Sequence, residues 1–400
     1  MVNRERTERI AELLHINRLD LTICALPANV VMLSGYWPVV GSGIAVATAG
    51  GRVSLLIPED EAELAQSGWA DDVRTFRPGS LETLRTVAET IRKPLTELLG
   101  PAAAKARIGF EDGEISEPAS YAGLHLYGGK MARLLADCLP HATLSAADNM
   151  LAELRAQKTP VEIDRLRVAC KIAGDSFRQG AGEIACGASE SEAANAFRGG
   201  LGTGSVDDRG VQRADGFAWC MSGPNSALAA GAYARSRART IQRGDLVLIH
   251  CNSYADGYWT DITRTYCVGA PDARQTGMYD AVLEAEEAAL QTIRPGASAA
   301  SVDRAARDIL SERGFGDAFK HSTGHGVGFE AISANALPRL HPQSPDVLRS
   351  GMVFNVEPAV YFEGYGGIRH CNMVAVGTDG YELLTPFQCE EGDLFLEAGK

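Results

Sequence analysis

The side chains most capable of chemistry in this sequence lie in separate segments of its second half. His250 ends the apolar run LVLIH, and Asp261 lies within GYWTDITRTY. His325 lies in STGHGVG, Glu357 in MVFNVEP and Cys371 in GGIRHCN. Imidazole, carboxylate and thiolate groups are the usual ligands of zinc and related transition metals in proteins. The five residues therefore form a candidate metal site.

Two adjacent strands are expected to position the first two of these residues. Residues 244–265 begin with an apolar run entered through a Gly-Asp turn and continue into a run rich in aromatic and β-branched residues. Both runs have the composition that is typical of strands. Pairing of these strands would bring His250 close to Asp261, and three later segments would supply the remaining groups.

The composition narrows the class of protein. The chain has 400 residues, enough for two or three domains with large cores. Its apolar content of 45% and charged content of 22% are ordinary for a soluble enzyme. A formal net charge of −13 argues against non-specific binding to nucleic acid. We therefore expect a soluble protein with no nucleic-acid partner.

The cysteines and the N-terminus favour a cytoplasmic protein. The nine cysteines are scattered and include no CxxC pair, which argues against a disulfide scaffold. The N-terminal segment MVNRERTERIAELLH is charged and helical in character, unlike a signal peptide. No apolar run approaches the about 20 residues that cross a bilayer, so no membrane association is expected.

Residues 1–150 are predicted to form an α/β domain, because strand-like and helical segments alternate along them. An amphipathic helix is expected near the N-terminus and a hairpin at Gly50-Gly51. The expected strands include 21–27, 30–37, 44–58 and 107–111, and the expected helices include 3–17 and 80–98.

Residues 151–400 are predicted to form a second domain. Pro160 can occupy the first turn of a long amphipathic helix that follows Lys158-Thr159. Further helices are expected at 275–293 and 299–313, and the last 50 residues are mostly strand-like.

Six segments occur in one order at sensible spacing: ELRAQKTPVEIDRLRVA, SGPNSAL, GDLVLI with GYWTDITRT, GHGVG, GMVFNVEPAVY and GGIRHCN. Together they resemble the pita-bread family, which includes creatinase, prolidase, aminopeptidase P and methionine aminopeptidase. The resemblance implies a creatinase-like N-terminal α/β domain and a C-terminal α+β pita-bread domain with a curved antiparallel sheet flanked by helices. It also implies a homodimer, in which Tyr36 or Trp37 either belongs to the core or reaches the partner's site.

The family site usually holds two divalent metals between Asp, Asp, His, Glu and Glu. By this resemblance Asp261, His325 and Glu357 keep the ligand types, whereas His250 replaces an Asp and Cys371 replaces a Glu. Further residues also depart from the pattern or match it near the site. Histidines that bind substrate in the peptidases are replaced by Ala229-Ala230 and by Ile332, whereas Tyr361 and Arg369 match.

These changes favour one metal over two. Two metals a few ångströms apart need anionic bridges, and imidazole cannot bridge as a carboxylate does. A single Zn²⁺ or Fe²⁺ held by Asp261, His325, Glu357 and Cys371, with His250 nearby, suits thiolate and imidazole better than Mn²⁺ does.

A metal-free site is the alternative, because creatinase has this fold without metals. His250 or His325 would then act as general acid or base, while Glu357 orients or protonates the substrate. Creatinase has a Glu on the second strand, and the corresponding residue of this chain is Thr263. The site residues of creatinase are therefore not reproduced here either.

Structural roles compete with functional ones at several positions. A free cysteine is often a small buried hydrophobe, so Cys371 is a packing residue, a ligand or, less simply, a nucleophile. His321 is either a supporting residue of the site or a packing residue. His370 is expected to point away from the site, because side chains alternate along a strand.

The function that the resemblance implies is an Xaa-Pro peptidase-like hydrolase, diverged to hydrolyse or otherwise cleave a C–N bond in a small metabolite. A true Xaa-Pro aminopeptidase or prolidase is one alternative, and a non-catalytic pita-bread binding protein is another. The catalytic candidates are His250, His325, Glu357, Tyr361 and Arg369.

Overall fold

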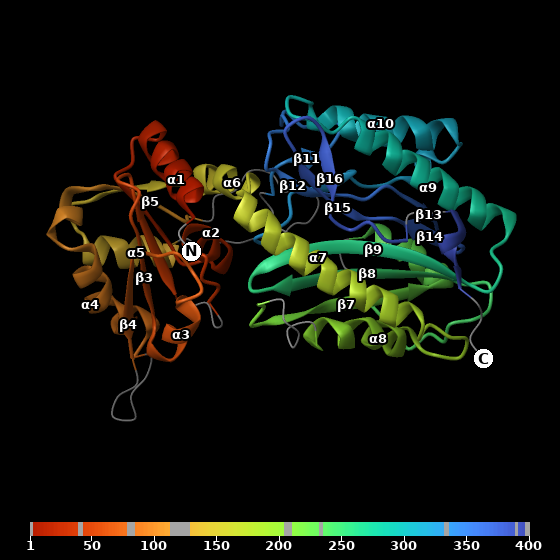
Figure 1. Cartoon of the computed structure of the whole chain (residues 1–400), viewed down its shortest axis with the longest axis horizontal. Helices are drawn as coiled ribbons and strands as arrows, with labels where there is room; N and C mark the ends of the chain where they lie inside the picture. Colours follow the sequence, from red (N-terminus) through yellow and green to blue (C-terminus); the bar gives the residue numbers. More distant parts are fainter. Residues whose placement is uncertain are drawn as a thin grey trace. The chain divides into compact units, whose positions relative to one another are not determined.

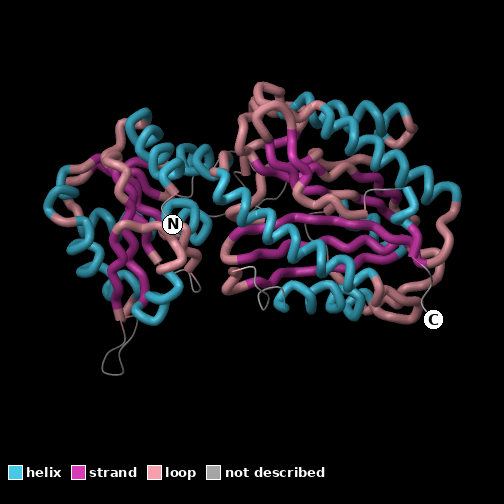
Figure 2. The backbone as a smooth tube through the Cα atoms, in the orientation of Figure 1, coloured by secondary structure: helices cyan, strands magenta, loops and turns pink. Residues whose placement is uncertain are grey.

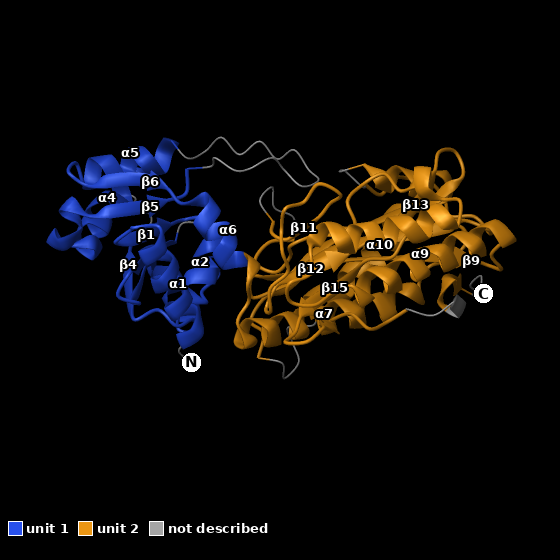
Figure 3. Cartoon of the chain, turned by 90° about the horizontal axis from the view of Figure 1, so that it is seen from above, with its two compact units in different colours: residues 1–117, 123–155 blue, residues 118–122, 156–400 orange. Residues whose placement is uncertain are grey.

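The computed structural model divides the chain into two compact units after Arg155 (Figure 3). The described residues are 3–38, 43–77, 85–112, 129–203, 210–231, 235–331, 336–388 and 391–396. Both units mix helices and sheets, which confirms the predicted α/β domain followed by an α+β domain.

The first unit is built on a six-stranded mixed sheet of order β4-β3-β2-β1-β5-β6. Only the pairs formed by β2 are antiparallel within that sheet. Its strands are β1 Leu21–Cys24, β2 Ile44–Thr48, β3 Val53–Pro58, β4 Asp72–Phe76, β5 Arg107–Phe110 and β6 Thr143–Ala146. Its helices are α1 Arg4–Ile16, α2 Pro27–Ser34, α3 Ala62–Ala65, α4 Val87–Leu99, α5 Gly129–Cys138 and α6 Asp148–Ala156.

The strand predicted at 30–37 is wrong, because helix α2 covers most of that run. Pro27 lies in the first turn of α2, where its missing N–H costs nothing. Gly35 ends the helix with φ 73°, a conformation that favours glycine. A short apolar run shows no periodicity that distinguishes a strand from a helix. The residues at its two ends therefore indicate which of the two structures forms. The hairpin predicted at Gly50-Gly51 is confirmed by the antiparallel pairing of β2 with β3.

The second unit contains the longest strands and helices of the chain (Figures 1 and 2). Strands β7 Ala214–Ser222, β8 Leu246–Ala255, β9 Tyr258–Val268 and β17 Phe395–Leu396 form a sheet of order β17-β9-β8-β7. Smaller sheets pair β12 Val353–Val356 with β15 Asn372–Val376 and β16 Tyr381–Leu383, β13 Ala359–Phe362 with β14 Gly366–Arg369, and β10 Gly324–His325 with β11 Arg339–Leu340.

Four helices of the second unit flank these sheets: α7 Pro160–Ala181, α8 Glu190–Thr203, α9 Ala273–Gln291 and α10 Ala299–Glu312. Helix α7 begins where the sequence predicts, with Pro160 in its first turn and a capping box between Thr159 and Glu162. Its buried side packs on β8 and β9 (Figure 1). Helices α9 and α10 pack on each other and share a large apolar core with β12, β13 and β15.

A tight turn fixes the register of β8 and β9. Asp256 and Gly257 both have positive φ, 49° and 85°, as a two-residue hairpin requires. The register then places Asn252 opposite Asp261 and His250 opposite Thr263. A one-residue slip would turn every site residue to the other face of the sheet.

No helix among the described residues combines the length and apolar character that a membrane crossing requires. The eight described cysteines are free thiols, and Cys389 lies outside the described residues.

Candidate active site

Strands β8 and β9 bring the first site residues to one face of their sheet. Directly opposed residues on neighbouring strands point to the same face. His250 and Thr263 form one such pair, and Asn252 and Asp261 form the next. An isolated bridge pairs Thr263 with Cys371, so the segment after β14 reaches the same place.

His325 lies on the short strand β10. The residue before it, Gly324, has no room for a side chain. A Cβ atom on Gly324 would lie 2.0 Å from the main-chain oxygen of Asn355. The side-chain oxygen of Asn355 accepts a hydrogen bond from the His325 main-chain N–H at 2.7 Å. Glu357 follows β12, and its N–H donates to the Thr323 carbonyl at 2.7 Å. These backbone contacts fix His325 and Glu357 relative to each other.

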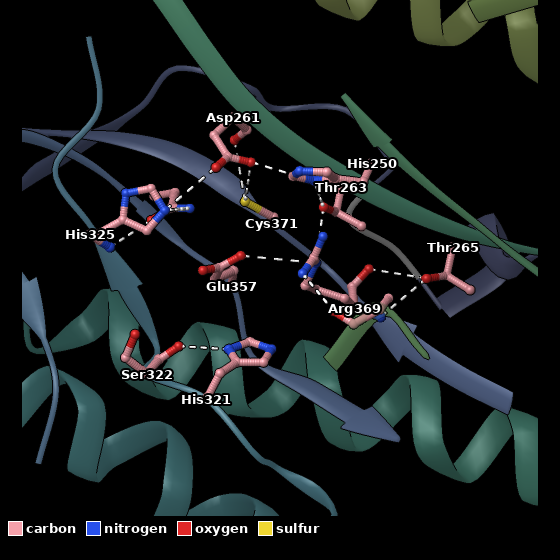
Figure 4. Close-up of polar contacts among 12 residues, drawn as sticks. His250, Asp261, Thr263, Thr265, His321, Ser322, His325, Glu357, Arg369 and Cys371 are labelled. Atoms are coloured by element: carbon pink, nitrogen blue, oxygen red, sulfur yellow. Dashed lines mark hydrogen bonds and ion pairs between the residues drawn. The ribbon is translucent and has the colours of Figure 1, made fainter. Parts of the chain in front are cut away.

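Asp261 lies between two imidazole rings (Figure 4). One carboxylate oxygen is 3.6 Å from His250 Nδ1 and the other is 3.5 Å from His325 Nε2. The Cys371 thiol donates to the Asp261 main-chain oxygen at 3.2 Å. All four residues are buried. A carboxylate so enclosed is shielded from water, and its charge acts strongly on the rings beside it.

Arg369 closes the other side of the cluster (Figure 4). Its Nε donates to Thr263 Oγ1 at 3.0 Å and lies 3.9 Å from a Glu357 carboxylate oxygen. Its Nη1 donates to the Ala229 carbonyl at 3.4 Å. The main chain at Ala229 therefore contributes a carbonyl group to the site. The resemblance places a substrate-binding histidine of the peptidases near this position, where this chain has only small side chains.

Asp261 and His325 form the ion pair of the site. Burial raises the pKa of Asp261, but the nearby charges of the histidine rings and Arg369 outweigh burial and lower it overall. Burial lowers the pKa of His325, but its hydrogen bond to Asp261 and the carboxylate charges raise it overall. These opposite pKa shifts favour an ion pair of an Asp261 carboxylate with a protonated His325 ring.

His250 is uncharged near neutral pH. Burial, followed by the charge of Arg369, lowers the pKa of His250 to about 4. Its Nδ1 lies 3.0 Å from Thr263 Oγ1, which also accepts a hydrogen bond from Arg369. The Thr263 hydroxyl proton is then free to point at Nδ1, as an unprotonated ring nitrogen requires.

Glu357 is the titratable group closest to neutrality. Burial raises the pKa of Glu357 to about 7, although the Arg369 charge opposes the shift. A carboxyl group with such a pKa can both accept and release a proton near neutral pH.

Cys371 has the character of a neutral thiol. Burial, followed by the charges of Asp261 and Glu357, raises the pKa of Cys371 well above its usual range. A nucleophilic cysteine needs the opposite, an electropositive environment that favours the thiolate. The environment of Cys371 therefore argues against the nucleophile hypothesis.

His321 and Tyr361 form a hydrogen-bonded pair beside this cluster. The His321 ring donates from Nδ1 to the Ser322 carbonyl at 2.8 Å, and its Nε2 accepts from the Tyr361 hydroxyl at 3.1 Å. Burial lowers the pKa of His321 to about 3, and burial raises the pKa of Tyr361 to about 12. Both groups are uncharged at neutral pH and support the site by shape and hydrogen bonding.

A buried polar network holds the segment that carries Arg369 and Cys371. Glu286 of α9 accepts from His370 Nδ1 at 2.7 Å and from Asn372 Nδ2 at 3.0 Å. Arg264 donates to the Cys371 carbonyl at 2.7 Å and to Asn372 Oδ1 at 2.6 Å. His370 is thus hydrogen-bonded to helix α9 and helps to hold the site segment in place.

The site residues do not fit a family-type pair of metals in the arrangement observed. Among the described residues, no group of three or more His, Cys, Asp and Glu side chains is placed so that it could hold a metal ion. The oxygens of Asp261 face imidazole rings, and Glu357 faces the Arg369 guanidinium. Two of the expected anionic ligands are replaced by a neutral imidazole and a neutral thiol. The assignment of a metal to these residues stays a prediction.

The structure gathers all seven predicted site residues in or beside one cluster: His250, Asp261, His325, Glu357, Tyr361, Arg369 and Cys371. Ile332 lies outside the described residues. Tyr36 is buried in the first unit and donates to Glu61, so the expectation that it reaches a partner's site stays untested.

Sequence reasoning missed Asn252 and Trp219. Asn252 is two residues after His250 on one strand, so alternation alone places both on the site face. Trp219 pairs with His250 across β7 and β8, and the two rings stack with centroids 5.5 Å apart. Only the strand register reveals this second neighbour.

Comparisons with known proteins agree with this geometry. Residues 164–378 match the model of metallopeptidase family M24. The chain is 31% identical over 387 residues to an Xaa-Pro dipeptidase from Pyrococcus furiosus, covering 97% of this chain and 99% of the relative.

Solved structures show the same two-domain fold. A prolidase from Pyrococcus horikoshii superposes with a TM-score of 0.74 at 29% identity, covering 95% of this chain and 98% of that one. An X-Pro aminopeptidase from Thermotoga maritima superposes with a TM-score of 0.75 at 23% identity, covering 95% and 97%, and supports the fold alone.

Proposed function

Because the chain belongs to metallopeptidase family M24 and is a hydrolase of the creatinase and aminopeptidase P type, we propose that it cleaves a C–N bond in a small peptide or peptide-like metabolite by acid–base chemistry. The observation that carries this proposal is the buried cluster in which Asp261 and His325 lie beside Glu357 and Arg369.

The proposed reaction uses one water molecule. Ionised Glu357 takes a proton from the water as its oxygen attacks the carbonyl carbon of the substrate. The C–N bond then breaks, and His325 gives its proton to the leaving nitrogen. Arg369 is the cationic group nearest to Glu357 and would stabilise negative charge on the carbonyl oxygen. Transfer of the proton from Glu357 to His325 restores both groups, and water and amide are thereby converted into acid and amine.

Asp261 supports this chemistry without exchanging a proton itself. Its ion pair keeps His325 protonated and oriented, as carboxylates do for catalytic histidines in other hydrolases. His250 and Cys371, in the positions where the family carries carboxylates, leave the cluster with fewer negative charges to be neutralised.

A metal-dependent Xaa-Pro dipeptidase is the second candidate. The names of the relatives and the retained Asp261, His325 and Glu357 favour it. A metal would supply a Lewis acid for the carbonyl oxygen and an activated water. Zn²⁺ or Fe²⁺ suits the histidines and Cys371 better than Mn²⁺ does.

One set of assays separates the two candidates. The protein, purified without chelator or immobilised-metal resin, is analysed for metal content and then assayed on Ala-Pro, Gly-Pro and an Xaa-Pro-Pro peptide. We expect turnover of at least one peptide that survives treatment with EDTA. Turnover that disappears with EDTA and returns with Mn²⁺, Zn²⁺ or Fe²⁺ would favour the second candidate. Absence of turnover under every condition would sink both peptidase versions.

A further inference from the structure

Asn252 presents a hydrogen-bond donor that nothing in the described structure uses. Its side chain is 3% exposed, and Nδ2 has no hydrogen-bond partner. An unpaired buried amide destabilises the fold, so such groups usually have a ligand or a water as partner.

The register directs this donor to the reacting groups. Asn252 lies opposite Asp261 on β9 and opposite Phe217 on β7, so the three side chains share the site face of the sheet. A hydrogen bond that the neighbouring His250 ring donates to the Asn252 amide oxygen favours the protonated form of that ring. The oxygen is thereby engaged with His250, and the NH₂ group is left for another acceptor.

An aromatic surface adjoins the amide on the β7 side. Phe217 and Trp219 stack with ring centroids 5.8 Å apart and an interplanar angle of 17°. Trp219 also stacks on His250, whose ring is 5% exposed. Phe217 is 51% exposed and Trp219 is partly exposed. The three rings therefore lead from solvent at the edge strand into the buried cluster.

We infer that Asn252, Trp219 and Phe217 form a substrate-binding subsite for a carbonyl-bearing group that carries an apolar ring. Asn252 Nδ2 donates to a carbonyl or carboxylate oxygen of the substrate, while the ring packs on the aromatic surface. This inference rests on the proposed function, because it places the reacting bond at Asp261, His325 and Glu357. It adds the feature by which the enzyme would prefer one peptide-like substrate over another.

Binding is measured in the full-length Glu357→Gln protein, which separates binding from turnover. Isothermal titration uses Phe-Pro and Gly-Pro as probes. We expect Phe-Pro to bind about tenfold more tightly than Gly-Pro, since an aromatic contact adds about 0.5–1.5 kcal/mol beyond area burial. Adding Asn252→Leu, which keeps the size and removes the donor, should weaken both peptides about tenfold, as expected for one lost hydrogen bond.

Two exposed phenylalanines on opposite edges of the same sheet provide a matched test that leaves the core intact. Phe217 lies on β7 and is 51% exposed, and Phe395 lies on β17 and is 46% exposed. Phe217→Ala should reduce the preference for Phe-Pro, and Phe395→Ala should leave it unchanged. The thermal midpoint of each variant shows whether it is folded.

The outcomes separate the subsite from the proposed function. If the wild-type protein hydrolyses neither peptide but the Glu357→Gln protein shows this binding pattern, the reaction is wrong and the subsite stands. If neither peptide binds, or if folded Asn252→Leu and Phe217→Ala variants keep both affinities within about twofold of the parent, the subsite is overturned whatever the enzyme hydrolyses.

Discussion

Charge balance at single residues distinguishes this site from a metal centre of four carboxylates and one histidine. Asp261 shares its negative charge with a protonated His325, while His250 and Cys371 are neutral. Glu357 has the Arg369 guanidinium as its cationic neighbour. A cationic side chain of the protein therefore lies beside each carboxylate of the cluster. Protonation of Glu357 then determines the net charge of the cluster.

Glu357 is expected to be essential as the base. Its pKa is raised to about 7, so the ionised form accumulates as pH rises through 7. The kcat/KM of the wild-type protein should therefore rise as pH rises through about 7, and it should fall at higher pH, where His325 loses the proton that the leaving nitrogen needs. Glu357→Gln should lower kcat by about 10²–10⁴-fold, the usual contribution of a general base.

The matched control for this variant is Glu363→Gln, which changes an exposed glutamate six residues later. It should keep both the rate and the pH profile of the wild-type protein. A Glu357→Gln enzyme with more than half of the wild-type kcat would remove Glu357 from the mechanism.

His321 is expected to destabilise the fold in acid. Its pKa is about 3 in the folded protein and near 6.5 when exposed, so unfolding takes up a proton between these values. The neutral His321 ring makes its full contribution to the free energy of unfolding above pH 6.5. This contribution is lost as pH falls towards 3, by up to about 1.4 kcal/mol per pH unit. Its charged and titratable neighbours include Arg369, Arg307 and His325, and the two arginines further disfavour a charged ring.

Thermal melts between pH 7 and pH 4.5 check this expectation. The melting temperature of His321→Asn should fall less over that range than the melting temperature of the wild-type protein. His15→Asn, at an exposed position of α1, should follow the wild-type curve. Parallel curves for all three proteins would show that His321 is charged in the fold or is not buried in solution.

The sequence could identify the candidate residues that the structure brings together, because each stands in its own recognisable segment, as His325 does in GHGVG. It could not supply their charges, because these depend on distances such as the one from Glu357 to Arg369. Asn252 escaped notice for a related reason. Its unpaired amide is a property of the packed sheet, and no local signal marks it.

At the scale of elements, close backbone contact positions His325, the proposed acid. Gly324 of β10 faces the main chain of Asn355, which cannot move without disturbing β12. Gly324→Ala would place Cβ 2.0 Å from the Asn355 oxygen, and the backbone that carries His325 would have to shift. We expect a loss of about 1–3 kcal/mol in the free energy of unfolding, as for other overpacked positions, together with a larger fractional loss of activity.

Gly277→Ala provides the control, because a Cβ at that position of α9 has no neighbour within 4 Å. It should be neutral or stabilising by up to about 1 kcal/mol, since alanine is the better helix former. Chemical denaturation and initial rates on the best substrate measure both effects. A Gly324→Ala protein as active and stable as Gly277→Ala would show that β10 is not constrained as described.

Elements with strong end signals were predictable from the sequence, and an element without periodicity was not. Helix α7 has Pro160 and a capping box at its start, and β8–β9 has the Asp256-Gly257 turn. Helix α2 resembled a strand, because its eight residues are almost entirely buried and show no amphipathic pattern. Tertiary burial on all sides removes the periodicity that sequence analysis needs.

At the scale of the whole molecule, each unit has a hydrophobic core of its own. The first core gathers residues such as Leu56, Ile108 and Leu135, and the second gathers Met278, Leu348 and Phe354. Separate cores of this size are the physical basis of independent domains. Two domains were predicted, residues 1–150 and residues 151–400; the catalytic role of the second domain stays a prediction, as do a homodimer and a cytoplasmic location.

Two core variants are expected to act on different units. Leu135 and Leu348 are both fully buried, one in each core, and Leu→Ala at such sites costs about 2–5 kcal/mol. By calorimetry on the full chain, Leu135→Ala should lower the unfolding temperature of the first unit alone, and Leu348→Ala that of the second. Below both transitions, Leu135→Ala should keep the wild-type kcat, because every side chain of the proposed mechanism belongs to the second unit. A single transition that both variants lower equally would mean that the two cores unfold as one cooperative structure, and the catalytic cluster would then depend on the first unit for its stability.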